Sequence, residues 1–171
     1  MIPSFRRYAN LRMNLLPYIC SEAWKSSRTG VPLMRPLTFE LPDDPVGRDH
    51  PYQYLFGEYL LVAPVVEEGR STWPVYLPQG EWFDLWTGEA HKGPKLHECQ
   101  TPKDIIPVFV RAGAFLALNH GDRYELGDAV GNAIDHYHNL CFEVYPNGLT
   151  RYDWFDGVTS EICNLTCDER P

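Results

Sequence analysis

Four acidic side chains in one short segment are the first residues in this sequence that suggest chemistry: Glu40, Asp43, Asp44 and Asp49. Enzymes that cleave glycosidic bonds use two carboxyl groups about 5 to 10 Å apart, one on each side of the bond. The stretch from residue 41 to residue 51, however, contains three prolines and reads as a loop. Acidic groups in such loops usually face solvent or accept hydrogen bonds from nearby amides. These carboxylates are therefore weak candidates for catalysis.

Histidine and cysteine residues are the candidates for metal ligands. His136 and His138 would point to opposite faces of a strand, which makes them a poor pair. Cys163 and Cys167 would need two further ligands, and no matching pair lies near them in the sequence. We therefore predict no metal and no cofactor. The five cysteines are an odd number at scattered spacings, which is typical of reduced thiols rather than of a disulfide framework.

Three tryptophans are candidates for carbohydrate contact. Trp73 and Trp82 open two predicted strands, Trp73–Leu77 and Trp82–Trp86, and Trp86 closes the second. Exposed rings on a β-sandwich can stack on the faces of sugars, whereas tryptophan in a small sandwich normally lies in the core. Both alternatives remain open, so the three tryptophans are weak candidates for substrate binding.

Composition narrows the class of protein. The chain has 171 residues, of which 44% are hydrophobic, and a formal net charge of −8. This hydrophobic fraction is typical of a packed protein. The chain is too short for a complete (β/α)8 barrel, which takes roughly 250 residues. The negative charge disfavours a nucleic-acid partner. No apolar run approaches the roughly 20 residues of a membrane span, and the N-terminus does not resemble a signal peptide, so we expect no membrane association and a cytoplasmic location.

A long amphipathic helix is predicted from Ser4 to Arg28, with Ser4 as its N-cap and Gly30 in the left-handed position after its end. Pro17 lacks an amide hydrogen, so we expect a kink in one continuous helix. The apolar residues recur at helical spacing: Tyr8, Leu11, Leu15, Tyr18, Ile19 and Ala23.

The rest of the chain predicts antiparallel β structure. Pro32 and Pro36 favour a short extended segment, and a long excursion is expected over Asn119–Asn139. A turn is expected at Pro78–Gly80. No helical stretch separates the predicted strands, which favours an antiparallel sandwich or barrel. These strands are Tyr59–Val66, Trp73–Leu77, Trp82–Trp86, Ile105–Arg111, Phe115–Leu118, Leu140–Tyr145, Arg151–Phe155 and Thr159–Cys163.

Six segments of the sequence carry motifs in a fixed order: RMNLLPY (12–18), GVPLMRPLTFELPDD (30–44), QYLFG (53–57), LLVAPV (60–65), WFDLWTG (82–88) and IPVFVRAG (106–113). Together they resemble the C-terminal part of family-31 glycoside hydrolases, the family of α-glucosidases and α-xylosidases. The resemblance implies that Pro17 is a family feature of the helix. One position departs from the family pattern: Pro51 stands where an aspartate is expected.

The resemblance implies a three-part organisation. Residues 1–57 would be the last helix and following segment of a truncated (β/α)8 barrel, residues 58–120 a proximal β-sandwich, and residues 121–171 the start of a truncated distal sandwich. The fold class is then mainly β: an antiparallel β-sandwich preceded by one long, proline-kinked helix. In this family the aspartate nucleophile and the aspartate acid/base lie on earlier barrel strands, and no residue here matches their motifs. We therefore assign no catalytic residue to this chain.

The expected function follows from that organisation. The chain would be the C-terminal region of a retaining α-glycosidase acting on α-glucosidic or α-xylosidic bonds, without activity of its own, and the parent enzyme would bind an α-linked oligosaccharide or glycoside. The alternative is a carbohydrate-binding module that uses the three tryptophans. Without a barrel, the apolar face of the helix has three alternatives: it folds back on the sandwich of the same chain, pairs with another copy, or frays. We expect the second, a homodimer through residues 5–23.

Overall fold

The structure, a computed structural model, describes residues 2–132 and 134–168. It divides into two compact units, Met1–Val31 with Gly113–Pro171, and Pro32–Ala112. The chain is mainly β with antiparallel sheets, which confirms the predicted fold class. The predicted boundaries at 57/58 and 120/121 concern the domains of a longer protein and stay a prediction. The compact units follow other boundaries, because the N-terminal helices pack with the C-terminal strands.

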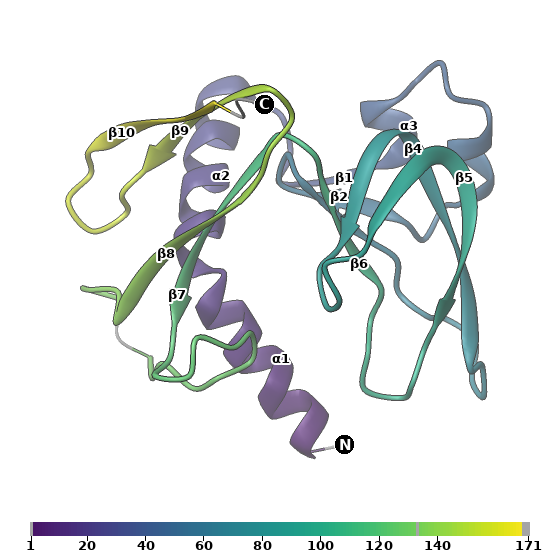
Figure 1. Ribbon diagram of the computed structural model, residues 1–171, viewed down its shortest axis with the longest axis horizontal. Helices are drawn as coiled ribbons and strands as arrows, with labels where there is room; N and C mark the ends of the chain where they lie inside the picture. The colour runs from purple at the N-terminus through teal and green to yellow at the C-terminus, as the bar shows by residue number, and fades with distance from the viewer. Residues whose placement is uncertain (1, 133, 169–171) are drawn as a thin grey trace. The chain divides into compact units, whose positions relative to one another are not determined.

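The predicted helix is present as two segments, α1 (Ile2–Asn14) and α2 (Leu16–Thr29), which run end to end in Figure 1. Leu15 separates them but keeps a right-handed helical backbone, so the segments form one bent helix. Pro17 lies in the first turn of α2, where a missing amide hydrogen costs least. Gly30 caps α2 with φ 75°, as predicted. Ser4 lies inside α1, so its predicted role as N-cap is wrong.

The apolar face of this helix packs on strands of its own unit. Both segments contact β7 (Ala114–His120), and α2 also contacts β9 (Leu149–Phe155). Leu11 and Leu15 are each only 8% exposed, and Tyr18 is fully buried. Of the three alternatives for this face, the structure shows the first, because strands of the chain itself that follow residue 113 cover it. The proposed homodimer loses the driving force from which it was predicted.

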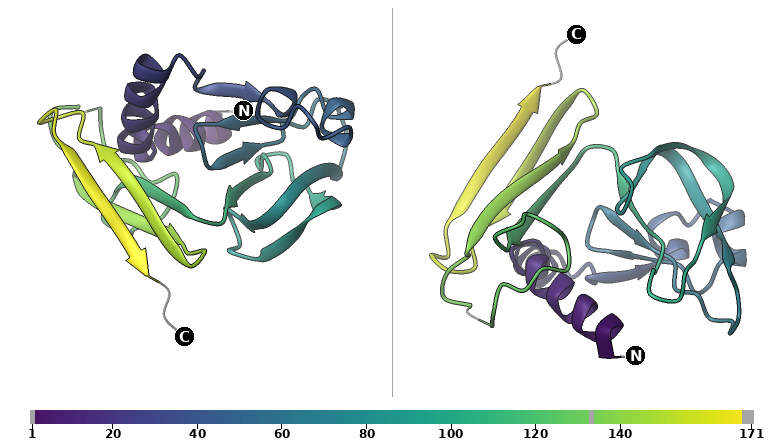
Figure 2. Two further views of the ribbon diagram at one scale, coloured as in Figure 1. Left: turned by 90° about the horizontal axis from the view of Figure 1, so that it is seen from above. Right: turned by 60° about the horizontal axis from the view of Figure 1, so that its bottom comes forward.

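Two small antiparallel sheets complete this unit (Figure 2). β7 pairs with β8 (Asn139–Tyr145), and β9 pairs with β10 (Ile162–Asp168). The predictions for β7, β8 and β9 fall inside these strands, whereas β10 begins three residues after the predicted start at Thr159.

The excursion between β7 and β8 is tied to the first helix. The Asn14 side chain, fully buried, donates hydrogen bonds from Nδ2 to the carbonyl oxygens of Asn119 and Asp128, at 2.8 and 3.2 Å. Its Oδ1 accepts the amide of Gly127 at 2.8 Å. One asparagine therefore satisfies three backbone groups of the predicted excursion.

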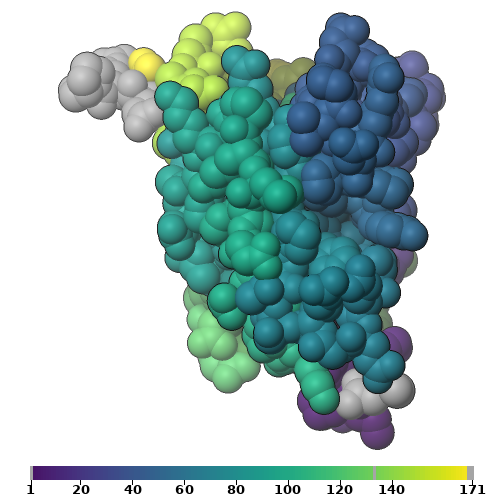
Figure 3. Space-filling view, turned by 90° about the vertical axis from the view of Figure 1, so that its right-hand side faces the viewer, coloured from purple at the N-terminus to yellow at the C-terminus, as the bar shows by residue number. Residues whose placement is uncertain are grey.

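The Pro32–Ala112 unit contains a six-stranded antiparallel sheet in the order β1-β2-β3-β6-β4-β5. Two short helical turns precede β2 and lie in or beside the predicted loop: α3 (Leu37–Glu40) and the 3-10 turn η1 (Val46–Asp49). Figure 3 shows the surface of this unit in blue to green. The strands are β1 (Met34–Pro36), β2 (Tyr54–Phe56), β3 (Leu60–Val62), β4 (Thr72–Asp84), β5 (Ala90–Gln100) and β6 (Val108–Arg111).

The long hairpin of β4 and β5 differs from the prediction. The expected strand 73–77 and the first three residues of the expected strand 82–86 belong to one strand, whereas Leu85 and Trp86 lie in the turn that follows it. The expected turn at Pro78–Gly80 is an irregularity in the pairing of β4 with β5. Gly93 lies opposite Gly80 there, and a Cβ on Gly93 would stand 1.9 Å from the Pro78 carbonyl oxygen. Only glycine permits this close approach. β5 was not predicted, because its sequence is rich in charged residues and histidine, which carry little strand propensity.

Candidate functional site

The structure separates the three tryptophan candidates. Trp82 is fully buried, and its Nε1 donates a hydrogen bond of 2.8 Å to the Pro78 carbonyl oxygen. Its ring therefore belongs to the core and presents no face to a sugar. Trp73 is partly buried and packs against the same core cluster. Of the two alternatives, core packing thus holds for Trp82, and it holds for the buried part of the Trp73 side chain.

Trp86 lies at a hollow of about 520 Å³ in the Pro32–Ala112 unit. Its Nε1 donates to the Ile106 carbonyl oxygen at 2.8 Å, and its backbone amide donates to Asp84 Oδ1 at 2.7 Å. Both ends of the residue are held, so the half-buried indole has a defined orientation. The hollow is lined by acidic, aromatic and apolar residues: Asp84, Trp86, Thr87, Glu89, His91, His97, Glu98, Cys99, Gln100, Pro102, Ile105 and Pro107.

Two histidines of β5 meet at this hollow. The ring centroids of His91 and His97 are 4.2 Å apart, and both rings contact Phe109 edge-on. Lys95 Nζ lies 3.2 Å from His91 Nδ1. Burial lowers the pKa of His97, and the neighbouring His91 and Lys95 lower it further, although Glu89 and Asp84 act in the opposite direction. His97 is therefore neutral at pH 7.

The bend of the hairpin creates this histidine pair. Six residues of straight strand would separate His91 from His97 by about 20 Å, at roughly 3.3 Å per residue. The irregular pairing between Leu77 and Gly80, opposite Gly93, folds β5 so that the two rings touch. Sequence reasoning missed both histidines. The signal for this histidine pair is that Gly80 pairs with Gly93, close to Pro78 and Pro94. This pairing is known only once the strand register is known.

Asp44 of the acidic segment has a structural role. Its Oδ2 accepts the Tyr76 hydroxyl at 2.6 Å, and its Oδ1 accepts the amides of Val46 and Gly47 at 3.0 and 3.4 Å, at the start of η1. The hydrogen bond from Tyr76 is the main cause that lowers the pKa of the Asp44 carboxyl. Burial, followed by the contact with Asp44, raises the pKa of Tyr76 to about 12. Asp44 thus caps a turn as an ionised acceptor.

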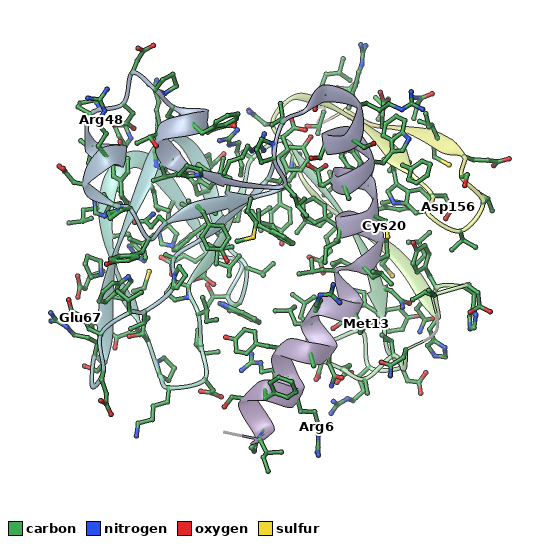
Figure 4. All side chains as sticks on the ribbon, turned by 180° about the vertical axis from the view of Figure 1, so that it is seen from behind. Arg6, Met13, Cys20, Arg48, Glu67 and Asp156 are labelled. Atoms are coloured by element: carbon green, nitrogen blue, oxygen red, sulfur yellow. The ribbon has the colours of Figure 1, made fainter. Side chains whose placement is uncertain are left out.

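Glu40 is held by two arginines. Its carboxylate lies 3.4 Å from Arg35 and 3.3 Å from Arg111, which joins α3 to β1 and β6. With Asp43 and Asp44 it lines a second hollow of about 580 Å³, whereas Asp49 does not contribute to the lining. Arg48 of the same segment lies at the surface in Figure 4. Glu40 and Asp44 are therefore committed to contacts that shape the loop.

His136 and His138, the weak candidates for metal ligands, contact different aspartates. His136 Nδ1 contacts Asp135 and His138 Nε2 contacts Asp122, each at 2.9 Å. Neither histidine lies on a strand, contrary to the assumption made for them. Within residues 2–132 and 134–168 no group of three or more histidine, cysteine or acidic residues is arranged to hold a metal ion.

All five cysteines are free thiols. Cys20 lies near Asp156, and Figure 4 labels both residues. Burial raises the pKa of the Cys20 thiol, while a hydrogen bond with Tyr137 opposes the shift.

Comparison with known proteins identifies the family. Residues 30–116, half of the chain, match the glycosyl hydrolase family 31 C-terminal domain. The chain belongs to glycosyl hydrolase family 31. It is 42% identical to the isomaltosyltransferase of Sporosarcina globispora over 99% of this chain and 16% of that protein. The α-xylosidase of Saccharolobus solfataricus is 40% identical over 95% of this chain and 23% of its own length.

A solved structure of the family shares the fold. The cycloalternan-forming enzyme from Listeria monocytogenes, in complex with a pentasaccharide substrate, matches with a TM-score of 0.96 and 42% identity. The match covers 99% of this chain and 16% of that one. The chain therefore spans about a sixth of the length of this enzyme and of the Sporosarcina relative, and its sequence and architecture correspond to their family-31 C-terminal portion.

Proposed function

We propose that this chain is the non-catalytic C-terminal region of a retaining α-glycosidase that acts on α-glucosidic or α-xylosidic bonds. The observation that carries the proposal is the match of residues 30–116 to the family-31 C-terminal domain. Retention requires a nucleophile and a proton donor on opposite sides of one bond. Glu40 and Asp44, in contrast, accept contacts from two arginines and from the amides of a turn. The chain then contributes β structure to a larger enzyme rather than reacting groups.

A chimera tests the scaffold role. The corresponding C-terminal portion of the Sporosarcina globispora isomaltosyltransferase is replaced by this chain, which is 42% identical to it. We expect a soluble chimera that retains transferase activity, because the two sequences are 42% identical over 99% of this chain. A chimera that folds but is inactive would contradict the scaffold role.

A separate assay tests the absence of catalysis. The purified chain is incubated with aryl α-glucoside and aryl α-xyloside, and we expect no turnover. Asp43→Asn and Asp44→Asn variants serve as controls for the acidic segment. Turnover that follows the protein through purification would overturn the non-catalytic assignment, and its loss in either variant would locate the reacting group.

The second candidate function is carbohydrate binding. The observation that favours it is the position of Trp86 at the hollow, with its indole held by Ile106 and Asp84. Titration with maltose, isomaltose and xylose, followed by tryptophan fluorescence, tests this function. A saturable change at millimolar sugar supports it, and no change leaves the scaffold role alone.

The expectations about other partners and location stay predictions. They are the absence of a nucleic-acid partner, the homodimer through residues 5–23, and the cytoplasmic location. In the part of the chain that the structure describes, no helix combines the length and hydropathy needed to cross a membrane.

A further inference from the structure

We propose that the hollow beside Trp86 binds one neutral, hydroxyl-rich ring of hexose size. The proposal rests on the second candidate function above, and it adds the place and the chemical class of the ligand. The volume of about 520 Å³ falls within the roughly 300 to 1,000 Å³ typical of small-molecule sites. The site is separate from the acidic segment at Glu40, Asp43 and Asp44, which lines a different hollow.

The hollow offers an apolar wall of fixed geometry. Trp86 supplies an aromatic surface, and Pro102, Ile105 and Pro107 line the same space. Because the indole donates to the Ile106 carbonyl oxygen, its orientation is set before a ligand arrives. A pre-oriented aromatic ring loses little conformational freedom on binding, which favours weak ligands such as single sugar rings. The apolar C–H face of a pyranose ring can stack on such a wall.

The polar lining offers both donors and acceptors. An ammonium group only donates hydrogen bonds, so His91 Nδ1 must accept the contact from Lys95. The other ring nitrogen, Nε2, then carries the hydrogen and is a donor. Asp84, Glu89 and Glu98 provide acceptor oxygens in the same lining. Alternating donors and acceptors are what a ring of hydroxyl groups requires, since each hydroxyl both donates and accepts.

The balance of charge favours a neutral ligand. Three carboxylates line the hollow and would repel a phosphate or a carboxylate ligand. Lys95, next to His91, opposes a cation at the histidine end.

Two-dimensional NMR of the full chain tests the site directly. The five tryptophan indole N–H signals are assigned by single Trp→Phe substitutions. The probes are methyl α-D-glucopyranoside, glucose 6-phosphate with the same ring and added negative charge, and glycerol, which has hydroxyls but no ring. We expect saturable shifts of the Trp86 indole with the neutral glucoside at millimolar concentration. Glucose 6-phosphate should bind at least tenfold more weakly, and glycerol should give no saturation.

Two variants and a control locate the binding. Trp86→Ala should raise the dissociation constant at least tenfold, whereas Trp24→Ala, in the other compact unit, should leave it unchanged. Glu98→Lys changes an exposed residue of the lining and should therefore keep the fold. It should narrow the discrimination against glucose 6-phosphate several-fold. This second variant keeps the test decisive if the Trp86→Ala protein does not fold.

The outcomes separate this inference from the functions on which it rests. Binding of the glucoside that persists unchanged in both Trp86→Ala and Glu98→Lys would overturn this site and leave carbohydrate binding elsewhere on the chain. Equal affinity for the glucoside and its phosphate would overturn the ligand class. No saturable shift with any probe would overturn the site and the carbohydrate-binding function together, while the scaffold role is decided separately by the chimera.

Discussion

Removal of the Asn14 side chain should detach the excursion between β7 and β8 from the helix. In the Asn14→Ala variant, the carbonyl groups of Asn119 and Asp128 and the amide of Gly127 all lose their hydrogen bond to this side chain. Each such bond contributes roughly 0.5 to 1.5 kcal/mol net, so three give a loss of about 1.5 to 4.5 kcal/mol. That is a large share of the roughly 5 to 15 kcal/mol typical of a domain.

Urea denaturation measures the loss. With a slope of roughly 2 kcal/mol per molar urea, the midpoint should fall by roughly 1 to 2 M. Amide hydrogen exchange gives a local measurement, and protection of the Gly127 amide should fall at least tenfold, since its acceptor is gone. The Asn14→Asp variant keeps an acceptor but loses both donated bonds and buries a charge, so we expect it to be at least as unstable as Asn14→Ala.

Asn10 provides the matched control. Its half-buried side chain donates one hydrogen bond of 2.9 Å to the Gly127 carbonyl oxygen, so Asn10→Ala should cost only about 0.5 to 1.5 kcal/mol. If the Asn14→Ala and Asn10→Ala proteins have the same urea midpoint and the same exchange at Gly127, the reasoning about this contact is wrong.

Three further predictions concern the Pro32–Ala112 unit. Gly93→Ala should prevent the bent hairpin from forming, since its Cβ would lie 1.9 Å from a backbone oxygen. Gly88 has φ 73° and open space around it, so Gly88→Ala should lower the free energy of unfolding by only about 1 to 2 kcal/mol. Circular dichroism and thermal melting compare the two variants. Because the pKa of His97 is lowered in the folded chain, the unfolded chain binds a proton more readily, and stability should fall as the pH drops below about 6.5. Thermal melts at pH 7.5 and 5.5 should therefore show a smaller fall in melting temperature for His97→Gln than for the unsubstituted chain. Tyr76→Phe should raise the pKa of the Asp44 carboxyl toward its usual value, because the hydroxyl donor is the main cause of its lowering, and an NMR titration that finds no rise would contradict this. In the unsubstituted chain, the stability linked to Asp44 is present above the pKa that this carboxyl has in the unfolded chain, and it is lost as the pH falls through the lower pKa of the folded chain. The Tyr76→Phe variant should lose this stability at a higher pH.

Local patterns in the sequence were sufficient for several elements. The helical spacing of Leu11, Leu15 and Tyr18 predicted which face of the N-terminal helix is apolar, and that face is buried. Gly30 was predicted as the C-cap because a left-handed backbone favours glycine. β8 was predicted from β-branched and aromatic residues almost to its ends. The family, too, was recognised from six motifs, five of which lie within the matched residues 30–116.

Contacts between distant residues decided what covers the helix and which tryptophan is accessible. Nothing in the period of residues 5–23 indicates that β7 and β9, more than ninety residues later, cover the helix, so a dimer was inferred instead. The same reasoning left Trp73, Trp82 and Trp86 equivalent. The fold buries Trp82 in the core of the Pro32–Ala112 unit and leaves Trp86 at the hollow.

The candidate site itself depends on the tertiary structure. His91 and His97 meet only because β4 and β5 pair with an irregularity opposite Gly93, and the edge-on contact of both rings with Phe109 requires β6 beside β4. Residue types and local spacing determine which backbone conformation a segment prefers. Pairing register and bending, in contrast, depend on the packing of segments that the sequence does not place side by side, and for this reason the site was visible only in the folded chain.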